Sequence, residues 1–309
     1  MSTKIEWCHI PGTQPKVWNL VTGCNKVSQG CKNCYAEVMH KRLTGMGQTK
    51  YQQPFLNGAV MHQDILNLPL TYKKPCTIFV NSMSDLFHED VTFHFLWDVW
   101  EIMSATPHHT FIILTKRPSR LFNFFQWAKN LKSFTAALPN VWLGVSCENQ
   151  ETANERIPLL LQIPAAVRFL SCEPLLGAID LTEITENNNT SYDVLIGKIY
   201  HYGDDEEFEK IDWVIAGGES GHNARPMHPN WALKLRDDCK YANVPFFFKQ
   251  WGEYIKAAPG QIGNPNKNKN FISVNDGNGN WCDMVKVGKK KAGRKINEIE
   301  YNEFPNTKF

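Results

Sequence analysis

Seven short apolar runs, separated by amphipathic segments, constrain the fold of this chain more than any other feature of its sequence. The runs are rich in β-branched and aromatic residues, which is typical of parallel strands covered by helices. Strands that alternate with helices predict an α/β fold. Seven of them fit a TIM-like (β/α) barrel, full or partial, better than a small Rossmann unit. The runs span 17–23, 77–83, 110–116, 141–147, 167–175, 212–220 and 245–251, and the helical patterns span 91–105, 118–134, 148–163 and 229–243.

Two segments interrupt this alternation. Residues 182–210 are polar and acidic, and we expect an insertion between two strands of a barrel that fills residues 1–256. Residues 257–309 show no barrel period and predict a C-terminal extension, either a small β-rich appendage or a loosely ordered tail. Residues 256–309 hold ten Lys or Arg against five Asp or Glu. This basic segment favours contact with the phosphates of DNA or RNA, although a lysine-rich solvated tail explains the same charge.

The sequence also predicts the compartment. No apolar run approaches the roughly 18 residues of a membrane span, and the N-terminus lacks the basic and apolar regions of a secretory signal. The nine cysteines are an odd number for a disulfide framework. We therefore expect a cytoplasmic protein whose clustered cysteines bind metal. Nothing in the sequence indicates an oligomeric state.

Three cysteines lie within eleven residues, at Cys24, Cys31 and Cys34, directly after the first predicted strand. Thiolates suit zinc or iron–sulfur clusters, and complete ligation by protein needs four groups. A [4Fe–4S] cluster with one open iron, a zinc ion completed by His9 or His40, and three free thiols are the alternatives. The helix expected after Cys34 would direct its N-terminal dipole at the loop, which favours the cluster.

Polar residues follow nearly every predicted strand. The carboxyl ends of barrel strands build the active site, and an apolar strand has no structural need for charged residues there. Seven such endings together favour a functional site over chance. The candidate residues are Asn81, Ser84, Asp85, Lys116, Arg117, Ser146, Cys147, Cys172, Glu173, Gly217, Gly218 and Glu219.

Eight motifs along the chain carry a resemblance to known proteins. They are IEW (5–7), WNLVTGCNKVSQGCKNCYAE (18–37), NSMSDLFHEDV (81–91), LTKRP (114–118), GVSCENQ (144–150), SCEPLLG (171–177), GGESGHNARPM (217–227) and PFFFKQWG (245–252). Together they resemble an uncharacterised phage and bacterial family with a three-cysteine motif and a predicted radical S-adenosylmethionine (SAM) fold, over roughly residues 4–252. The Cys-Tyr ending of the cysteine loop and the Ser-Asp, Thr-Lys and Ser-x-Glu strand ends resemble, more weakly, spore photoproduct lyase. The cysteines here are separated by six and then two residues, whereas three and then two is usual in radical SAM enzymes.

The resemblance implies a radical SAM enzyme, in which Cys24, Cys31 and Cys34 hold a [4Fe–4S] cluster and SAM chelates the open iron. One electron from an external donor then cleaves SAM, and the resulting radical abstracts hydrogen from a substrate. Charge predicts the SAM contacts: a carboxylate for the ammonium group, a cation for the carboxylate, and small polar residues for the ribose. These are Glu173 and Glu219; Lys116 or Arg117; and Asn81, Ser84, Asp85 and Ser146. Gly217 and Gly218 would allow close backbone approach, and Tyr35 belongs to the same cofactor region.

The likeness to spore photoproduct lyase adds a hydrogen-donor cysteine, for which Cys147 and Cys172 are candidates. Three functions remain open from the sequence. The first is a radical SAM enzyme in nucleic-acid repair or modification. The second is a radical SAM enzyme on a small metabolite, a peptide or a protein. The third is a zinc-bearing nucleic-acid-binding protein without catalysis.

Overall fold

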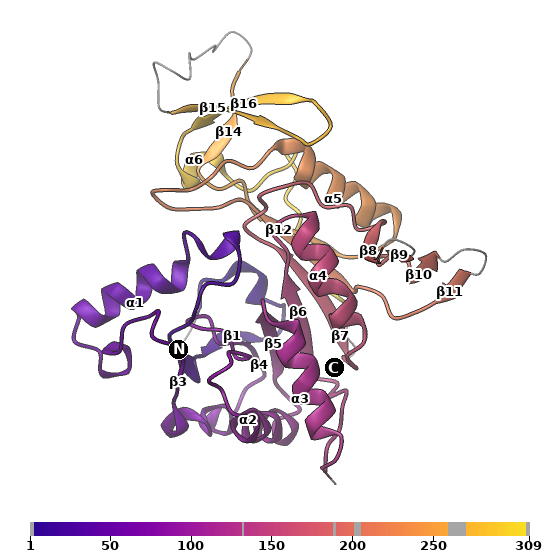
Figure 1. Cartoon of the computed structure of the whole chain (residues 1–309). Coiled ribbons are helices and arrows are strands. Elements are labelled where there is room, and N and C mark those ends of the chain that lie inside the picture. The colour runs from indigo at the N-terminus through magenta and orange to yellow at the C-terminus, as the bar shows by residue number, and fades with distance from the viewer. Residues whose placement is uncertain (1–2, 132, 188–189, 201–204, 259–269, 307–309) are drawn as a thin grey trace. The chain divides into compact units, whose positions relative to one another are not determined.

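The computed structural model describes residues 3–131, 133–187, 190–200, 205–258 and 270–306 (Figure 1). All seven predicted strands form one sheet, in the order β1-β4-β5-β6-β7-β12-β13. Neighbouring strands run parallel where their register is defined, from β1 to β6 and between β12 and β13. The strands are β1 (Gln14–Trp18), β4 (Cys76–Val80), β5 (Thr110–Thr115), β6 (Val141–Ser146), β7 (Val167–Cys172), β12 (Trp213–Gly217) and β13 (Phe246–Gln250).

The strand order confirms the predicted α/β class and defines the form of the sheet. β1 and β13 stand at its two edges, so the order is that of an open sheet, compatible with a partial barrel. The first predicted strand is divided in two. β1 ends at Trp18, and β2 (Val21–Thr22) pairs instead with β3 (Val60–Met61) in a separate antiparallel ribbon.

Four helices coincide with the four helical patterns of the sequence. They are α2 (Phe93–Ala105), α3 (Pro118–Ala128), α4 (Gln150–Leu161) and α5 (Pro229–Tyr241), and α1 (Tyr35–Gly45) follows the cysteines. Thr92 caps α2 by accepting the Phe95 N–H at 3.2 Å, which satisfies a free donor of the first turn. No helix within the described ranges is both long and apolar enough for a membrane span. Short 3-10 helices lie at η1 (Glu6–Cys8), η2 (Gln29–Cys31), η3 (Thr49–Tyr51), η4 (Gln63–Ile65) and η5 (Leu68–Thr71).

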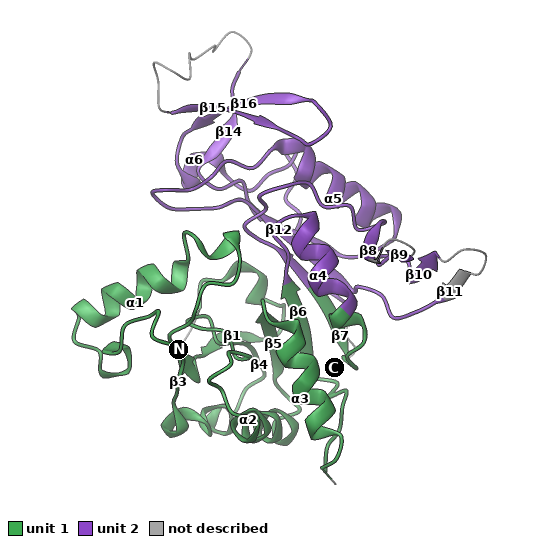
Figure 2. Ribbon diagram, in the orientation of Figure 1, with its two compact units in different colours: residues 1–145, 159–169, 306–309 green, residues 146–158, 170–305 purple. Residues whose placement is uncertain are grey.

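The chain divides into two compact units, coloured separately in Figure 2. Unit 1 comprises residues 1–145, 159–169 and 306–309, and unit 2 comprises residues 146–158 and 170–305. Residue 256, where the sequence suggested that a barrel ends, is not a boundary between them. Each unit has its own buried aromatic core, with Trp18, Phe111 and Trp142 in unit 1 and Trp213, Phe246 and Phe248 in unit 2.

The acidic segment 182–210 forms a second, four-stranded sheet in the order β11-β10-β9-β8. Its defined pairs are antiparallel, and Ile184 and Val194 are fully buried at its base. The expected insertion is therefore a small sheet rather than a plain loop. The strands are β8 (Ile184–Asn187), β9 (Thr190–Asp193), β10 (Lys198–Tyr200) and β11 (Asp205–Glu207).

The described part of the C-terminal extension is β-rich, which was the first of the two alternatives. β14 (Tyr254–Lys256), β15 (Phe271–Asn275) and β16 (Trp281–Lys286) form an antiparallel sheet over a core of Tyr254, Cys282 and Met284. The short α6 (Lys289–Ala292) follows.

The end of the described chain then returns to the edge strand β13. The Phe248 N–H donates to the Tyr301 carbonyl at 3.0 Å, and the Trp213 indole donates to the Glu303 carbonyl at 2.9 Å. The extension thus packs within unit 2 and covers an edge that would otherwise expose its backbone groups.

Candidate functional site

The three clustered cysteines lie on one loop of unit 1, between β2 and α1. Cys24 opens the loop, Cys31 ends η2, and Cys34 immediately precedes the first residue of α1. All three are free thiols of intermediate burial. The Cys34 side chain makes no capping hydrogen bond to α1. The loop thus presents three thiols that are neither paired nor sealed in a core.

The start of this loop has one permitted backbone conformation. Gly23 has a φ of +81°, and a Cβ there would lie 2.2 Å from the Gly58 carbonyl oxygen. The Cys24 N–H donates to the Phe55 carbonyl at 2.8 Å, and the Ser84 hydroxyl donates to the Gly23 carbonyl at 2.5 Å. Only glycine fits residue 23. Cys24 therefore enters the loop from a fixed position.

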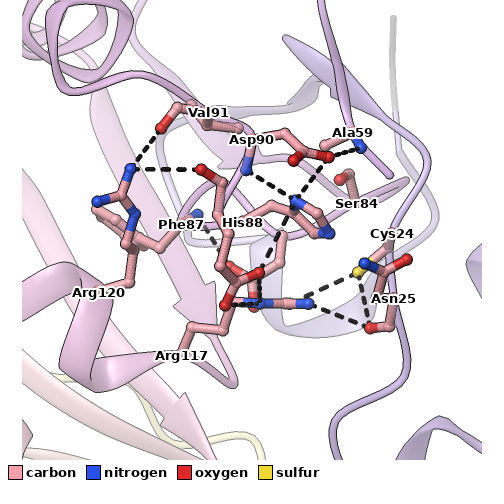
Figure 3. A network of polar contacts seen from close by, with 12 residues as sticks. Cys24, Asn25, Ala59, Ser84, Phe87, His88, Asp90, Val91, Arg117 and Arg120 are labelled. Carbon is pink, nitrogen blue, oxygen red and sulfur yellow. Dashed lines mark hydrogen bonds and ion pairs between the residues drawn. The ribbon is translucent and has the colours of Figure 1, made fainter. Parts of the chain in front are cut away.

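The Arg117 side chain connects this loop to two strand ends (Figure 3). Its Nη1 donates to the Cys24 sulfur at 3.6 Å, and its Nη2 donates to the Asn25 carbonyl at 3.2 Å. Its Nε donates to the Glu89 carboxylate at 3.1 Å. Arg117 is only 5% exposed, so these contacts form with little competition from water.

Asp85 holds the other side of the guanidinium and is itself buried. It pairs with Arg117 Nη1 at 3.4 Å and accepts the Thr115 hydroxyl at 2.7 Å. It also accepts the backbone N–H groups of Lys116 at 2.9 Å and Phe87 at 3.0 Å. Both carboxylate oxygens are thus engaged by the protein. Asp85 joins the segments after β4 and β5, whereas the helix that follows it, α2, is capped by Thr92.

Burial and charge act in opposite directions on Cys24. Burial raises the pKa of its thiol, the Arg117 guanidinium lowers it, and the net direction is upward. Thiolate formation, which metal ligation requires, is therefore helped locally by Arg117 against the cost of desolvation.

His88 lies in the same network and is fully buried. Its Nδ1 accepts the Asp90 N–H at 3.2 Å, while its Nε2 has no hydrogen-bond partner within the described residues. Burial, and then Arg117, lowers the pKa of His88. A neutral ring that accepts at Nδ1 carries its hydrogen on Nε2, so His88 holds a buried donor beside the Asp85–Arg117–Glu89 group.

The glycines and glutamates predicted after β7 and β12 make their contacts inside unit 2. Glu173 pairs with Lys249 at 2.8 Å, and Glu219 binds Arg225 at 2.6 Å. A Cβ on Gly217 would lie 3.2 Å from the Glu173 carboxylate, and one on Gly218 would lie 2.2 Å from the Trp251 carbonyl oxygen. Close protein packing thus accounts for both glycines without a ligand. Each glutamate carboxylate is already paired with a cationic side chain.

Ser146, Cys147 and Cys172, from the ends of β6 and β7, are all buried. Burial raises the pKa of Cys172 well above that of an ordinary thiol, and Cys147 and Cys239 nearby add to the effect. The Cys172 thiol therefore resists deprotonation, and a hydrogen-donor role for Cys172 would use the neutral S–H group.

The remaining predicted residues differ in how far the protein already engages them. Asn81 is buried with a φ of +62°, and its Oδ1 accepts the Val21 N–H at 3.1 Å. Tyr35 is 65% exposed at the start of α1. The Lys116 backbone binds Asp85, and its side chain is partly exposed. Asn81 thus has a structural role, whereas Tyr35 and the Lys116 side chain are accessible.

The donor chemistry of the loop fits a thiolate-bound metal or cluster, but its side chains do not form a completed ligand set. Among the described residues, no three His, Cys, Asp or Glu side chains are grouped to hold a metal ion. The Cys24 sulfur contacts Arg117 and the Asn25 carbonyl, and Cys31 lies 3.9 Å from the Ser28 hydroxyl. Binding would require the thiols to lose their protons, and with them the S–H donation from Cys24 to the Asn25 carbonyl, whereas the N–H that Arg117 donates to the Cys24 sulfur is compatible with a bound metal.

The two histidines considered for a fourth zinc ligand each use Nε2 elsewhere, while the buried Nδ1 of His40 has no hydrogen-bond partner among the described residues. His40 Nε2 lies 2.8 Å from the Gln53 carbonyl, and the buried ring packs against Tyr51 and Phe55. His9 Nε2 lies 3.1 Å from the Thr3 carbonyl. Neither histidine lies grouped with the cysteines as a ligand.

Comparison with known proteins identifies the family. A model described as "Protein of unknown function (DUF5131)" matches residues 2–305. The chain belongs to the DUF5131 family. No curated protein matches it, and no solved structure does.

The sequence analysis of this DUF5131 chain did not single out His88, Glu89 or Arg225. A signal for the first two was present, since His-Glu-Asp at 88–90 follows Asp85 closely and is strongly polar after an apolar strand. Arg117 was considered only as a ligand for the SAM carboxylate. The structure instead engages its guanidinium with Cys24, Asn25, Asp85 and Glu89.

Proposed function

We propose that this DUF5131 chain is a radical SAM enzyme whose Cys24, Cys31 and Cys34 hold a [4Fe–4S] cluster. The observation that carries the proposal is the loop of three free, partly buried thiols in the connection between β1 and β4, two neighbouring strands of an open α/β sheet. Thiolates are the standard ligands of such clusters, and three of them leave one iron for a cofactor. When bound, the cluster supplies the electron, received from an external donor, that cleaves the sulfonium of SAM.

In this proposal the chain's own residues bind and orient the cluster and SAM. Ser84 and the Phe55 carbonyl hold the backbone at Cys24, so one ligand is positioned before the cofactor arrives. Lys116, whose side chain is partly exposed, is our proposed contact for the SAM carboxylate.

For the substrate we propose a nucleic acid, to be repaired or modified. The support is the basic C-terminal extension, where α6 carries three successive exposed lysines, Lys289, Lys290 and Lys291. Trp281 on β16 is 71% exposed, and an exposed indole can stack on an unpaired base. Lysines that bind phosphates would make the affinity fall with salt.

Anaerobic reconstitution with iron and sulfide tests the cluster. Wild-type protein should turn brown and, with dithionite, cleave SAM to 5′-deoxyadenosine. Cys24→Ala, Cys31→Ala and Cys34→Ala should each lose both properties. Cys282→Ala, which removes a thiol from the core of the C-terminal sheet, is the matched control and should retain them. A colourless protein that retains zinc and leaves SAM intact would refute the enzyme and favour a zinc-bearing binding protein.

A separate measurement tests the substrate class. Fluorescence anisotropy with single-stranded DNA and RNA oligonucleotides, at two or more salt concentrations, should show binding that weakens with salt. The triple variant Lys289→Gln, Lys290→Gln, Lys291→Gln should bind less tightly and with a smaller salt slope. Equal affinity of the triple variant and wild type would refute the role of α6. Cluster chemistry without nucleic-acid binding would favour a small metabolite, peptide or protein as substrate.

A further inference from the structure

We propose that Arg117 is a positioning residue that holds Cys24 and raises the reduction potential of the cluster bound there. The inference rests on the proposed function, because it assigns a role toward the [4Fe–4S] group. Arg117 contacts the sulfur of the proposed ligand Cys24, not the iron, through a buried guanidinium.

The Arg117 side chain binds four groups of the protein. Arg117 donates to the Cys24 sulfur and to the Asn25 carbonyl, both on the cysteine loop. It also binds the carboxylates of Asp85 and Glu89, which follow β4. The loop and the arginine are more than ninety positions apart in sequence. The guanidinium therefore ties the first cysteine to the ends of two strands.

Only an arginine side chain can make all four of these contacts. A guanidinium presents five N–H donors in a planar fork, so it can reach two carboxylates, a carbonyl and a sulfur at the same time. A lysine ammonium in the same place has three donors around one atom and would lose part of this set. The backbone N–H of residue 117, which any substitution other than proline keeps, donates to the Thr115 hydroxyl at 2.9 Å.

The effect of Arg117 on the reduction potential is electrostatic. Reduction adds one negative charge to a cluster that thiolates already make electron-rich. A positive group that donates an N–H to a ligand sulfur stabilises the more negative, reduced form, and this raises the potential. Arg117 is 5% exposed, so water screens the effect weakly. Asp85 and Glu89 hold the guanidinium in place and reduce its net charge without replacing its N–H donors.

The test is the midpoint potential of the reconstituted protein, from redox titration followed by EPR. Arg117→Gln should load iron and sulfide and show a lower midpoint potential than wild type. Arg117→Lys, which keeps the charge and loses the fork, should lie between the two. Arg120→Gln is the matched control. Arg120 lies one turn further along α3, donates to the backbone carbonyls of Val91 at 2.9 Å and Glu89 at 3.5 Å, and covers the Phe93 ring. Since these contacts involve no sulfur, Arg120→Gln should leave the potential unchanged.

The possible outcomes separate this inference from the proposed function. Wild-type protein that takes up no cluster refutes the proposed function, and the inference falls with it. Wild-type and Arg117→Gln clusters with the same midpoint potential refute the inference alone. A lower potential in Arg117→Gln with intermediate recovery in Arg117→Lys supports it. If Arg117→Gln fails to fold, the Arg117→Lys shift relative to Arg120→Gln decides.

Discussion

The two units contain similar residues in different surroundings. Each has a buried arginine bound to a carboxylate, and each has thiols after a strand. In unit 1, Arg117 extends from Asp85 and Glu89 to a thiol that is only partly buried. In unit 2, Arg156 and Glu148 form a closed pair at 3.1 Å, and neighbouring Cys147 and Cys172 are fully buried. Exposure and hydrogen-bond partners, more than residue type, thus distinguish the partly buried thiols of the loop from the fully buried thiols of the core.

The largest expected difference is in thiol reactivity. In native, metal-free protein, Cys24, Cys31 and Cys34 should react with a maleimide, while Cys147, Cys172 and Cys239 should react only after unfolding. Burial raises the pKa of Cys172 and Cys239, and labelling them needs an opening reaction of the fold. Rates should differ by roughly a hundredfold or more if that opening costs several kcal/mol. Mass spectrometry of labelled peptides over time measures this.

Full denaturation in guanidinium provides the control, since all nine thiols should then react alike. Rapid native labelling of Cys147 or Cys172 would contradict the contrast between the units and would revive either cysteine as an accessible group.

The next effect in size is on stability. Glu148 and Arg156 are 1% and 2% exposed, so Glu148→Ala leaves a buried guanidinium without its carboxylate. We expect a loss of about 3–5 kcal/mol in the free energy of unfolding. Glu173→Ala removes the partner of Lys249 at a more exposed pair and should cost less, about 1 kcal/mol. Urea denaturation measures both, and equal losses would show that burial does not separate these pairs.

The sequence predicted the sheet well because its signal is local. Apolar runs such as 110–116 and 141–147 are strands whatever lies far away in the chain, and β5 and β6 match them closely. The break after β1 was missed because it depends on a distant contact. The Asn19 side chain accepts the Ser82 N–H at 2.9 Å, where the chain leaves the sheet.

The candidate site was predicted only in part, for the same reason. The spacing of Cys24, Cys31 and Cys34 is visible in the sequence, and so are polar strand ends. The contact between Arg117 and Cys24 arises from folding, as does the burial of Cys147. No local pattern distinguishes an arginine that binds a ligand from one that binds a thiol and two carboxylates.

A backbone change tests how the cysteine loop is held in unit 1. Gly23→Ala should destabilise the protein by about 2 kcal/mol or more and reduce iron loading, because φ is positive and the new Cβ would meet the Gly58 carbonyl. Gly12→Ala is the matched control. Its φ is +84°, but nothing lies within 4 Å of a new Cβ, so it should cost less, about 1 kcal/mol, and load iron normally. If both variants lost the same stability and loaded the same amount of iron, the close contact with the Gly58 carbonyl would not be the cause of the Gly23→Ala effect.

The smallest expected effect compares one buried histidine from each unit. Burial lowers the pKa of both His88 and His228, and each ring accepts a backbone N–H at Nδ1. The unfolded chain therefore binds protons that the folded chain does not, once the pH falls below about 6.5. Stability should be constant above that value and decrease as the pH falls from it toward the lowered folded pKa. The slope is about 1.4 kcal/mol per pH unit for each histidine.

His88→Asn and His228→Asn remove the titration and keep a side-chain acceptor for the backbone N–H. Urea midpoints between pH 7 and 5 should fall less steeply in each variant than in wild type. The two effects should add, because the histidines belong to different units. An unchanged slope in His88→Asn would mean that the ring has the same pKa in the folded and the unfolded chain, and it would refute the lowering of the His88 pKa by burial.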